Sequence, residues 1–486
     1  MRALGLWLVV GGVFLATACG GGDDDESTTA PTITSISVTC SPAIVTSDQT
    51  SSCSANVSGT GNFSSAVTWS ASAGSVNSSG LFTAPPVSSA TSVTITATST
   101  QDSTRSGSAT VTVNPATTAY NVLPIIVDGG PPGIAPYYVN GLFASVRVCA
   151  PGSTTQCQTI DHVLVDTGSV GLRLLSAAGD GQFSLSLPQQ KAPDGNPLVE
   201  CLQFVDGFTW GPVAVADIYL GSEVASSTPI QVIAPADVPE VPSSCNNTGT
   251  NENTLSLLGV NGILGVGLFL QDCGEACSQQ LFNLYYSCPN TGCVETQVPT
   301  VQQVQNPVAL FANDNNGVID KLPAVSNAGQ ATVNGSLVFG IGTQSNNGLD
   351  GAVVYATTAV GSFTVTYKGK PYASSFIDSG SNGLYFLTAA DAGLPLCSIN
   401  SSFYCPTTEK SFTTTNEGSN GVSGAVTFNI AHAETLFDSG NTAFNNLGGT
   451  FSGAFDYGLP FFFGRNLYVA IENQNTPGGV GPYWAY

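Results

Sequence analysis

Positive charge and histidine are both scarce in this sequence. Lys and Arg total 10 against 32 Asp and Glu, which gives a formal net charge of -22. Binding to nucleic acid depends on clustered Lys and Arg, so we expect no nucleic-acid partner. The two histidines, His162 and His432, are too few for a multi-histidine zinc site, and a Ser-His-acid triad would need one of them. We therefore expect no metal and no cofactor, and a structural role for both histidines.

Long helical patterns are also missing, because no extended stretch repeats apolar residues at the spacing of an amphipathic helix. Instead, 55 Gly and many Ser and Thr separate short segments in which apolar and polar residues alternate. Such segments, bounded by turn residues, are typical of β-strands. With 486 residues, of which 42% are hydrophobic, the chain is long enough for two to four domains with real cores. We predict an all-β protein.

The N-terminus predicts export. Residues 1–18 contain Met1-Arg2, an apolar run and small residues before Cys19, and the run is too short for a transmembrane helix. This pattern resembles a bacterial lipoprotein signal. The resemblance implies a lipid on the Cys19 thiol, a membrane partner at the bacterial cell envelope or surface, and a polar tether over residues 19–32. Ordinary cleavage with free secretion remains the alternative.

Cysteine numbers agree with a lipidated Cys19. The chain has 13 cysteines, and without Cys19 an even set of twelve remains. An even set of closely spaced cysteines in an exported chain predicts disulfides, here six, although spacing alone does not prove their connectivity. Most of them form short-range couples, with Cys201 and Cys245 left over: Cys40/Cys53, Cys149/Cys157, Cys273/Cys277, Cys288/Cys293 and Cys397/Cys405.

Residues 33–115 form the first predicted domain. Short alternating segments such as Ala66-Val-Thr-Trp69-Ser are separated by Gly, Asn and Pro turns, as in a β-sandwich. Together with Asn77-Ser-Ser-Gly80-Leu-Phe-Thr83, they resemble bacterial Ig-like domains of the invasin/intimin type. The resemblance implies a spacer or adhesion module, in which Trp69 belongs to the core.

Two copies of one motif organise the remaining sequence. Val163-Leu-Val-Asp166-Thr-Gly-Ser-Val-Gly-Leu172 and Ser375-Phe-Ile-Asp378-Ser-Gly-Ser-Asn-Gly-Leu384 place their acids 212 residues apart. An apolar strand that stops at an acid, followed by a small hydroxyl residue and Gly, presents a carboxylate on a tight turn. Two such turns predict a site of paired carboxylates. A third triplet, at Asp438, lacks the continuation Ser-X-Gly-Leu, and we interpret Asp438 as a loop or turn residue.

The surroundings of the two motifs point to one family. An Asp-Gly tip between apolar arms predicts a hairpin at residues 204–211. The apolar-apolar-Gly segments that end at Gly265 and Gly464 follow the two acids after 99 and 86 residues. These features resemble pepsin-like aspartic peptidases, and the chain is also similar to an uncharacterised bacterial lipoprotein family with such a domain. The resemblance implies a bilobal double-β-barrel over residues 120–486, with an N-lobe at 120–330 and a C-lobe at 331–486.

The resemblance also assigns roles to individual residues. Asp166 and Asp378 would form the catalytic dyad. Hydroxyls would brace the two turns, glycines would admit the backbone close to the acids, and serines would hydrogen-bond the carboxylates. These supporting residues are Thr167 and Ser379, Gly168 and Gly380, and Ser169 and Ser381. In that family each Asp turn is locked by the later apolar-apolar-Gly strand.

A substrate-covering flap is implied at the predicted hairpin, with Phe204, Asp206 and Gly207 at its tip. Here two residues depart from the family pattern. Phe204 stands where a Tyr is usual, and Arg173 stands where a Trp usually supports that Tyr. Pepsin-like peptidases also carry a basic pro-segment, but residues 20–120 contain one Arg and no Lys, so such a segment is not expected here.

We therefore predict a lipid-anchored, monomeric aspartic endopeptidase that hydrolyses peptides or proteins outside the cytoplasm. The alternative is a pepsin-fold surface protein that binds peptides or a partner with little or no cleavage, which the altered flap favours. A third possibility is a purely structural or adhesive surface protein.

Overall fold

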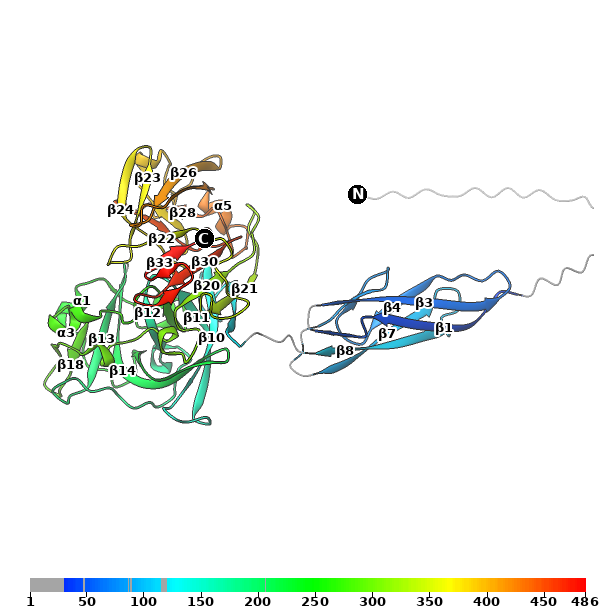
Figure 1. The fold of residues 1–486 in the computed structure, drawn as a ribbon, viewed down its shortest axis with the longest axis horizontal. Helices are drawn as coiled ribbons and strands as arrows, with labels where there is room; N and C mark the ends of the chain where they lie inside the picture. Colours follow the sequence, from blue (N-terminus) through cyan, green and yellow to red (C-terminus); the bar gives the residue numbers. More distant parts are fainter. Residues whose placement is uncertain (1–29, 47–48, 86, 88–89, 115–119, 206) are drawn as a thin grey trace, which may run out of the picture. The chain divides into compact units, whose positions relative to one another are not determined.

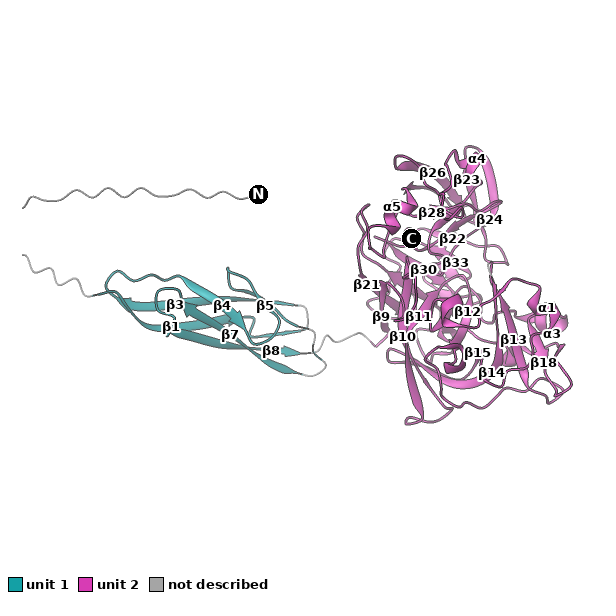
Figure 2. Cartoon of the chain, turned by 180° about the vertical axis from the view of Figure 1, so that it is seen from behind, with its two compact units in different colours: residues 1–117 teal, residues 118–486 magenta. Residues whose placement is uncertain are grey.

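The structure is a computed structural model that describes residues 30–46, 49–85, 87, 90–114, 120–205 and 207–486 (Figure 1). The predicted signal peptide, Cys19 and most of the predicted tether therefore lie outside the described residues. Contacts divide the chain into two compact units, residues 1–117 and 118–486 (Figure 2). Strands dominate both units, which confirms the predicted all-β class. None of the described helices is long and apolar enough to cross a membrane.

The first unit contains two four-stranded sheets, ordered β1-β3-β6-β5 and β2-β8-β7-β4. Alternation builds its core: Val93, Ile95 and Ala97 on β7 are buried, and the residues between them are exposed or half-buried. Trp69 packs against this core, as expected. The strands are β1 (Thr32–Ser41), β2 (Ile44–Thr46), β3 (Thr50–Thr60), β4 (Val67–Ala71), β5 (Ser75–Val76), β6 (Leu81–Thr83), β7 (Thr91–Ser99) and β8 (Ser106–Asn114).

The second unit begins with a closed barrel. Six strands follow one another in the order β14-β15-β12-β17-β11-β10, and a further pairing between β10 and β14 closes the ring. Strands β13, β16, β18 and β19 extend the sheet from β14. These strands are β10 (Gly141–Cys149), β11 (Cys157–Asp166), β12 (Val170–Leu175), β13 (Leu198–Gln203), β14 (Gly207–Leu220), β15 (Glu223–Ile233), β16 (Thr250–Asn251), β17 (Gly262–Val266), β18 (Tyr285–Ser287) and β19 (Val294–Glu295).

A run of six strands, β9-β21-β20-β30-β33-β22, continues the same sheet from β10. The boundary predicted between the lobes falls between β20 and β21 of this run. The strands are β9 (Val122–Asp128), β20 (Gly317–Lys321), β21 (Val333–Phe339), β22 (Val354–Ala356), β30 (Asn466–Ala470) and β33 (Tyr483–Ala485). β31 (Asn475–Thr476) and β32 (Gly479–Val480) form a separate small hairpin.

A second, seven-stranded sheet is ordered β27-β26-β23-β24-β29-β25-β28. In Figures 1 and 2, β23, β24 and β26 lie at one end of the second unit, and β13, β14 and β18 lie at the other. The arrangement of barrel, connecting strands and second sheet is consistent with the predicted pepsin-like fold. The strands are β23 (Phe363–Tyr367), β24 (Lys370–Ile377), β25 (Leu384–Phe386), β26 (Lys410–Glu417), β27 (Ser423–Ile430), β28 (Gly448–Gly449) and β29 (Phe455–Tyr457).

Helices are short throughout the described residues, with at most five residues each. The α-helices are α1 (Ser243–Asn246), α2 (Leu255–Leu258), α3 (Glu275–Gln279), α4 (Ala389–Ala392) and α5 (Ala433–Phe437). The 3-10 helices are η1 (Ala177–Gly179), η2 (Thr300–Gln302), η3 (Val308–Leu310) and η4 (Leu459–Phe461).

All twelve cysteines among the described residues form disulfides, which confirms the predicted six bonds. Five join the short-range couples seen in the sequence. The sixth joins the two remaining cysteines, Cys201 on β13 and Cys245 in α1, across 44 residues. It ties the predicted flap hairpin to the loop that follows the barrel strand β15.

Candidate active site

Each aspartate motif makes a turn between two strands that are separated by a third strand. β11 ends at Asp166, and β17 lies between β11 and β12, parallel to the first and antiparallel to the second. In the second motif β24 ends just before Asp378, and β29 lies in the same way between β24 and β25. Because the middle strand pairs on both sides, it holds the two arms of each turn in place.

The strand that locks the second turn differs from the predicted one. Gly265 pairs with Asp166 in the first turn as expected, but β29 and the following Gly458, not residues 462–464, lie against the second turn. A methyl carbon added at Gly458 would lie 2.5 Å from the carbonyl oxygen of Ser381, so glycine is required there. The apolar-apolar-Gly rule missed this strand because an acid, Asp456, interrupts it.

Hydroxyl residues brace the two turns against each other. The backbone N–H of Thr167 donates to Ser379 Oγ at 3.0 Å, and the N–H of Ser379 donates to Thr167 Oγ1 at 2.9 Å. Ser379 Oγ also donates to the carbonyl oxygen of Val165 at 2.7 Å. Both side chains are buried, so these bonds join two segments more than 200 residues apart within the protein interior.

Each carboxylate accepts the same pair of hydrogen bonds from its own turn. Gly168 N–H donates to Asp166 Oδ1 at 2.8 Å, and Ser169 Oγ donates to Asp166 Oδ2. In the second turn, Gly380 N–H donates to Asp378 Oδ1 at 2.8 Å and Ser381 Oγ donates to Asp378 Oδ2 at 3.0 Å. The carboxyl groups are therefore oriented by backbone and hydroxyl donors.

The glycines of the two turns face the opposite acids. A methyl carbon at Gly168 would lie 2.6 Å from Cγ of Asp378, and one at Gly380 would lie 2.7 Å from Oδ1 of Asp166. Only glycine lets the turns approach this closely. Burial, followed by the charges of Asp166 and Asp456 and a hydrogen bond with Asp166, raises the pKa of Asp378 well above its usual value. The structure thus brings the two predicted acids together as an interacting pair.

A third carboxyl, not foreseen from the sequence, lies beside this pair. Ser381 Oγ is 2.6 Å from Oδ2 of Asp456, a residue that is only 7% exposed. Burial raises the pKa of Asp456 to about 8, the charge of Asp166 adds to this rise, and the hydrogen bond from Ser381 opposes it. The sequence offered only a weak signal, an acid within an otherwise apolar strand two residues before a glycine.

The predicted flap hairpin is present as β13 and β14, which pair antiparallel with Gln203 opposite Phe208. Phe204 is half-buried and packs against a cluster that includes Leu164 and Ile263, while Gly207 begins β14. Asp206 lies outside the described residues.

Arg173, at one of the positions that depart from the family pattern, is fully buried. Its guanidinium lies 2.6 Å from Glu200 Oε1 and 3.1 Å from Asp272 Oδ2, and it donates to the carbonyl oxygen of Val170. Burial, and next the charge of Glu200, raise the pKa of Asp272 well above its usual value. Because Arg173 lies on β12 and Glu200 on β13, this network ties the strand after the first acid to the hairpin of β13 and β14.

The other candidate groups lie outside the dyad. His162 is beside Asp128, and His432 caps α5. Asp438 ends α5 and is exposed. Among the described residues one group of three potential metal ligands clusters, but two of its members are joined in a disulfide and offer no thiolate: Cys397, Cys405 and Glu434.

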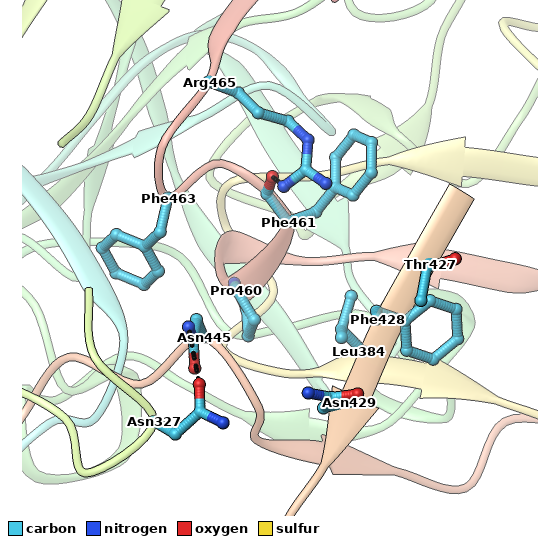
Figure 3. Close-up of a pocket in the computed structure, with 10 residues that line it drawn as sticks. All are labelled: Asn327, Leu384, Thr427, Phe428, Asn429, Asn445, Pro460, Phe461, Phe463 and Arg465. Carbon is cyan, nitrogen blue, oxygen red and sulfur yellow. Dashed lines mark hydrogen bonds between the residues drawn. The ribbon is translucent and has the colours of Figure 1, made fainter. Parts of the chain in front are cut away.

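Two hollows lie in the C-terminal half. The first, of about 220 Å³, is lined by Leu384 just after the second turn and by Arg465, whose guanidinium lies 4.2 Å from the centre of the Phe461 ring (Figure 3). The second, of about 360 Å³, also includes Arg465 together with the C-terminal Tyr486. Neither is lined by Asp166 or Asp378, so neither is assigned to the carboxyl pair.

Comparisons with known proteins give a family and a structural likeness. The family model described as "Protein of unknown function (DUF3443)" matches residues 117–486. A comparison with curated proteins gives no match. Among solved structures, the chain is similar to the one titled "Crystal structure of aspartic proteinase from Irpex lacteus", with a TM-score of 0.44 and 15% identity, over 75% of this chain and 96% of that chain.

Proposed function

The chain belongs to the DUF3443 family, whose description leaves the function open, and we propose that its second unit is an aspartic endopeptidase with Asp166 and Asp378 as the catalytic pair. The observation that carries this proposal is the mutual approach of the two turns. Each turn places a glycine against the opposite carboxyl, and Thr167 and Ser379 join the turns by reciprocal hydrogen bonds. A structural role alone would not require two acids to be held together against their repulsion.

The proposed chemistry follows from that repulsion. Two neighbouring carboxyls cannot both ionise easily, so they share one proton over a range of pH. The ionised member takes a proton from a water, and the water attacks the peptide carbonyl. The protonated member donates a hydrogen bond to the developing oxyanion. The apparent pKa values belong to the pair, so no individual protonation state is assigned to the working enzyme.

Peptide binding without cleavage is the second candidate function. Phe204 offers no hydroxyl to a substrate, and Arg173 is engaged with Glu200 and Asp272. The proposed flap hairpin is therefore held by a buried ionic network, which differs from the pattern of pepsin-like peptidases. Such a hairpin could hold a peptide in a site whose dyad turns over slowly.

Export and surface display form part of the same proposal. Six disulfides are typical of proteins from oxidising compartments. We propose that a lipid on Cys19 anchors the chain to a membrane, and that an Ig-like first unit spaces the peptidase from it. Free secretion is the alternative outcome, and mass spectrometry of the mature N-terminus distinguishes the two.

The test is hydrolysis of a fluorescence-quenched peptide mixture by the purified full chain, from about pH 3 to about pH 7. Asp378→Asn and Asp166→Asn should each reduce turnover by about a thousandfold or more, and a statine-type transition-state analogue should block the wild type. Asp438→Asn is the matched control, because Asp438 has the same Asp-Ser-Gly triplet but is exposed; it should retain full activity.

Two results would contradict the endopeptidase. Full activity in Asp378→Asn would exclude the dyad. Undetectable turnover at every pH, together with saturable binding of the same peptides, would instead establish the peptide-binding function.

A further inference from the structure

The third carboxyl, Asp456, shares one hydroxyl with the proposed dyad. Ser381 Oγ lies 2.6 Å from Asp456 Oδ2 and 3.0 Å from Asp378 Oδ2. A serine hydroxyl has one hydrogen and can donate it to only one of these oxygens at a time. The other oxygen of Asp456, Oδ1, is buried without a hydrogen-bond partner among the described residues. At least one of the two acids must therefore carry a proton for the group to be stable.

The fold itself does not require an acid at this position. The two turns are built alike, and Asp456 precedes Gly458 by two residues as Ile263 precedes Gly265. Ile263 is 4% exposed and packs against apolar neighbours. An apolar residue therefore suits the equivalent strand position, and the carboxyl at Asp456 has the cost of burial without a structural need.

The surroundings of Asp456 keep it neutral until the pH is high. Its neighbours across the strand pairs are Phe376 on β24 and Tyr385 on β25, and neither carries a positive charge. Two acids act on it: Asp378 is linked to Asp456 by the Ser381 hydroxyl, and the charge of Asp166 raises the pKa of Asp456. Burial raises the pKa of Asp456 to about 8. Its ionisation therefore competes directly with that of the pair.

We propose that Asp456 is a positioning acid that, once it has ionised at high pH, keeps one proton on the Asp166/Asp378 pair through Ser381. This inference rests on the proposed function. As the pH rises, Asp456 ionises, and only the Ser381 hydroxyl separates its negative charge from Asp378. This charge disfavours the loss of the last proton from the pair. A dyad without this third acid would lose that proton, and with it activity, at a lower pH.

The test compares the pH dependence of kcat/KM in the wild type and in Asp456→Asn, which keeps the shape of the side chain but cannot ionise. The upper apparent pKa should fall by about one unit, so the variant should lose about tenfold in activity above that pKa and little at about pH 4. Asp456→Ile, which copies the equivalent position in the first turn, should shift the profile in the same direction.

Asp320→Asn is the matched control. Asp320 is a fully buried acid on β20, and burial alone raises its pKa to about 7. Its profile should match that of the wild type. An unchanged upper limb in Asp456→Asn, or an equal loss at every pH, would overturn the proposal and leave Asp456 a structural residue.

A second measurement separates this inference from the proposed function. In protein labelled with ¹³C-aspartate, the carboxyl signals of Asp166 and Asp378 can be assigned from the Asp→Asn variants and titrated without a substrate. The upper titration of the pair should move to lower pH in Asp456→Asn even if no peptide is cleaved. An unmoved titration in a folded variant refutes the inference, whereas a moved titration in an inactive protein refutes only the peptidase.

Discussion

Replacing Arg173 with leucine should destabilise the second unit strongly, because two buried acids would lose the cation they share. Arg173 is 0% exposed and lies 2.6 Å from Glu200 and 3.1 Å from Asp272. Removing one partner of a buried ion pair costs about 3–5 kcal/mol. The guanidinium also donates to Val170 O, and leaving a buried acceptor unsatisfied costs about 1–3 kcal/mol. We expect a loss of roughly 5 kcal/mol in the free energy of unfolding at neutral pH.

The loss should shrink as the solution becomes acidic. Burial and the charge of Glu200 already raise the pKa of Asp272 in the folded state. Without the guanidinium this pKa rises further, so the folded variant binds a proton that the unfolded chain has released. A group with a raised folded pKa favours folding less and less as the pH rises from its unfolded toward its folded pKa. The two proteins differ in this respect only between the folded pKa of Asp272 in the wild type and the higher one in the variant, so their difference should be smallest at about pH 4 and grow only above the wild-type folded pKa.

Urea unfolding, followed by the fluorescence of the buried Trp210 and Trp484, measures the difference in unfolding free energy between wild type and Arg173→Leu across this pH range. Arg147→Leu is the matched control in the same barrel, because Arg147 lies over the ring of Tyr219 at 4.7 Å; it should cost about 1 kcal/mol. The triple variant Arg173→Met, Glu200→Leu and Asp272→Leu should recover most of the lost free energy of unfolding, since no uncompensated buried charge then remains.

Two results would contradict this prediction for Arg173→Leu. A loss below about 1 kcal/mol at neutral pH would show that the two acids do not depend on Arg173 for their burial. A large loss that does not change with pH would show that packing, not charge, explains the cost.

Two further changes test other parts of the same unit. Ser379→Ala should reduce the free energy of unfolding by about 2–4 kcal/mol, because it leaves Thr167 N–H and Val165 O buried without their partner; Ser379→Thr should retain most of it, and equal unfolding midpoints for wild type and Ser379→Ala would contradict the brace. Asp320→Leu should be increasingly more stable than the wild type as the pH rises from about 4 to 7, by up to about 4 kcal/mol in the free energy of unfolding. The reason is that burial raises the folded pKa of Asp320 to about 7, so the wild type loses stability over this range and the leucine variant does not. A constant difference between the two proteins in thermal unfolding across this range would contradict the prediction.

Local signals in the sequence were enough for the turns and their immediate supports. Each motif combines an apolar strand with a small hydroxyl residue and glycine, and this combination specifies a tight turn whatever lies around it. The resemblance then predicted that Thr167 and Ser379 brace the turns, and both residues lie where that role requires. Five of the six disulfides join cysteines close in sequence, so their pairing was visible as spacing.

Long-range strand pairing was beyond such signals. Gly464 satisfied the apolar-apolar-Gly pattern, but Gly458 lies against the second turn, because register depends on which strand pairs with β24 and β25 and not on local composition. Arg173, Glu200 and Asp272 come from three separate segments, and only packing brings them together.

By itself, then, the sequence determined an all-β chain with two carboxylate turns and six disulfides, because strands, turns and cysteine spacing are local properties. The tertiary structure decided that the turns meet at their glycines, that Arg173 is neutralised by Glu200 and Asp272, and that Asp456 stands beside the pair. These outcomes depend on contacts between distant segments, where burial and charge act over a few Å, and a linear pattern carries no record of such distances.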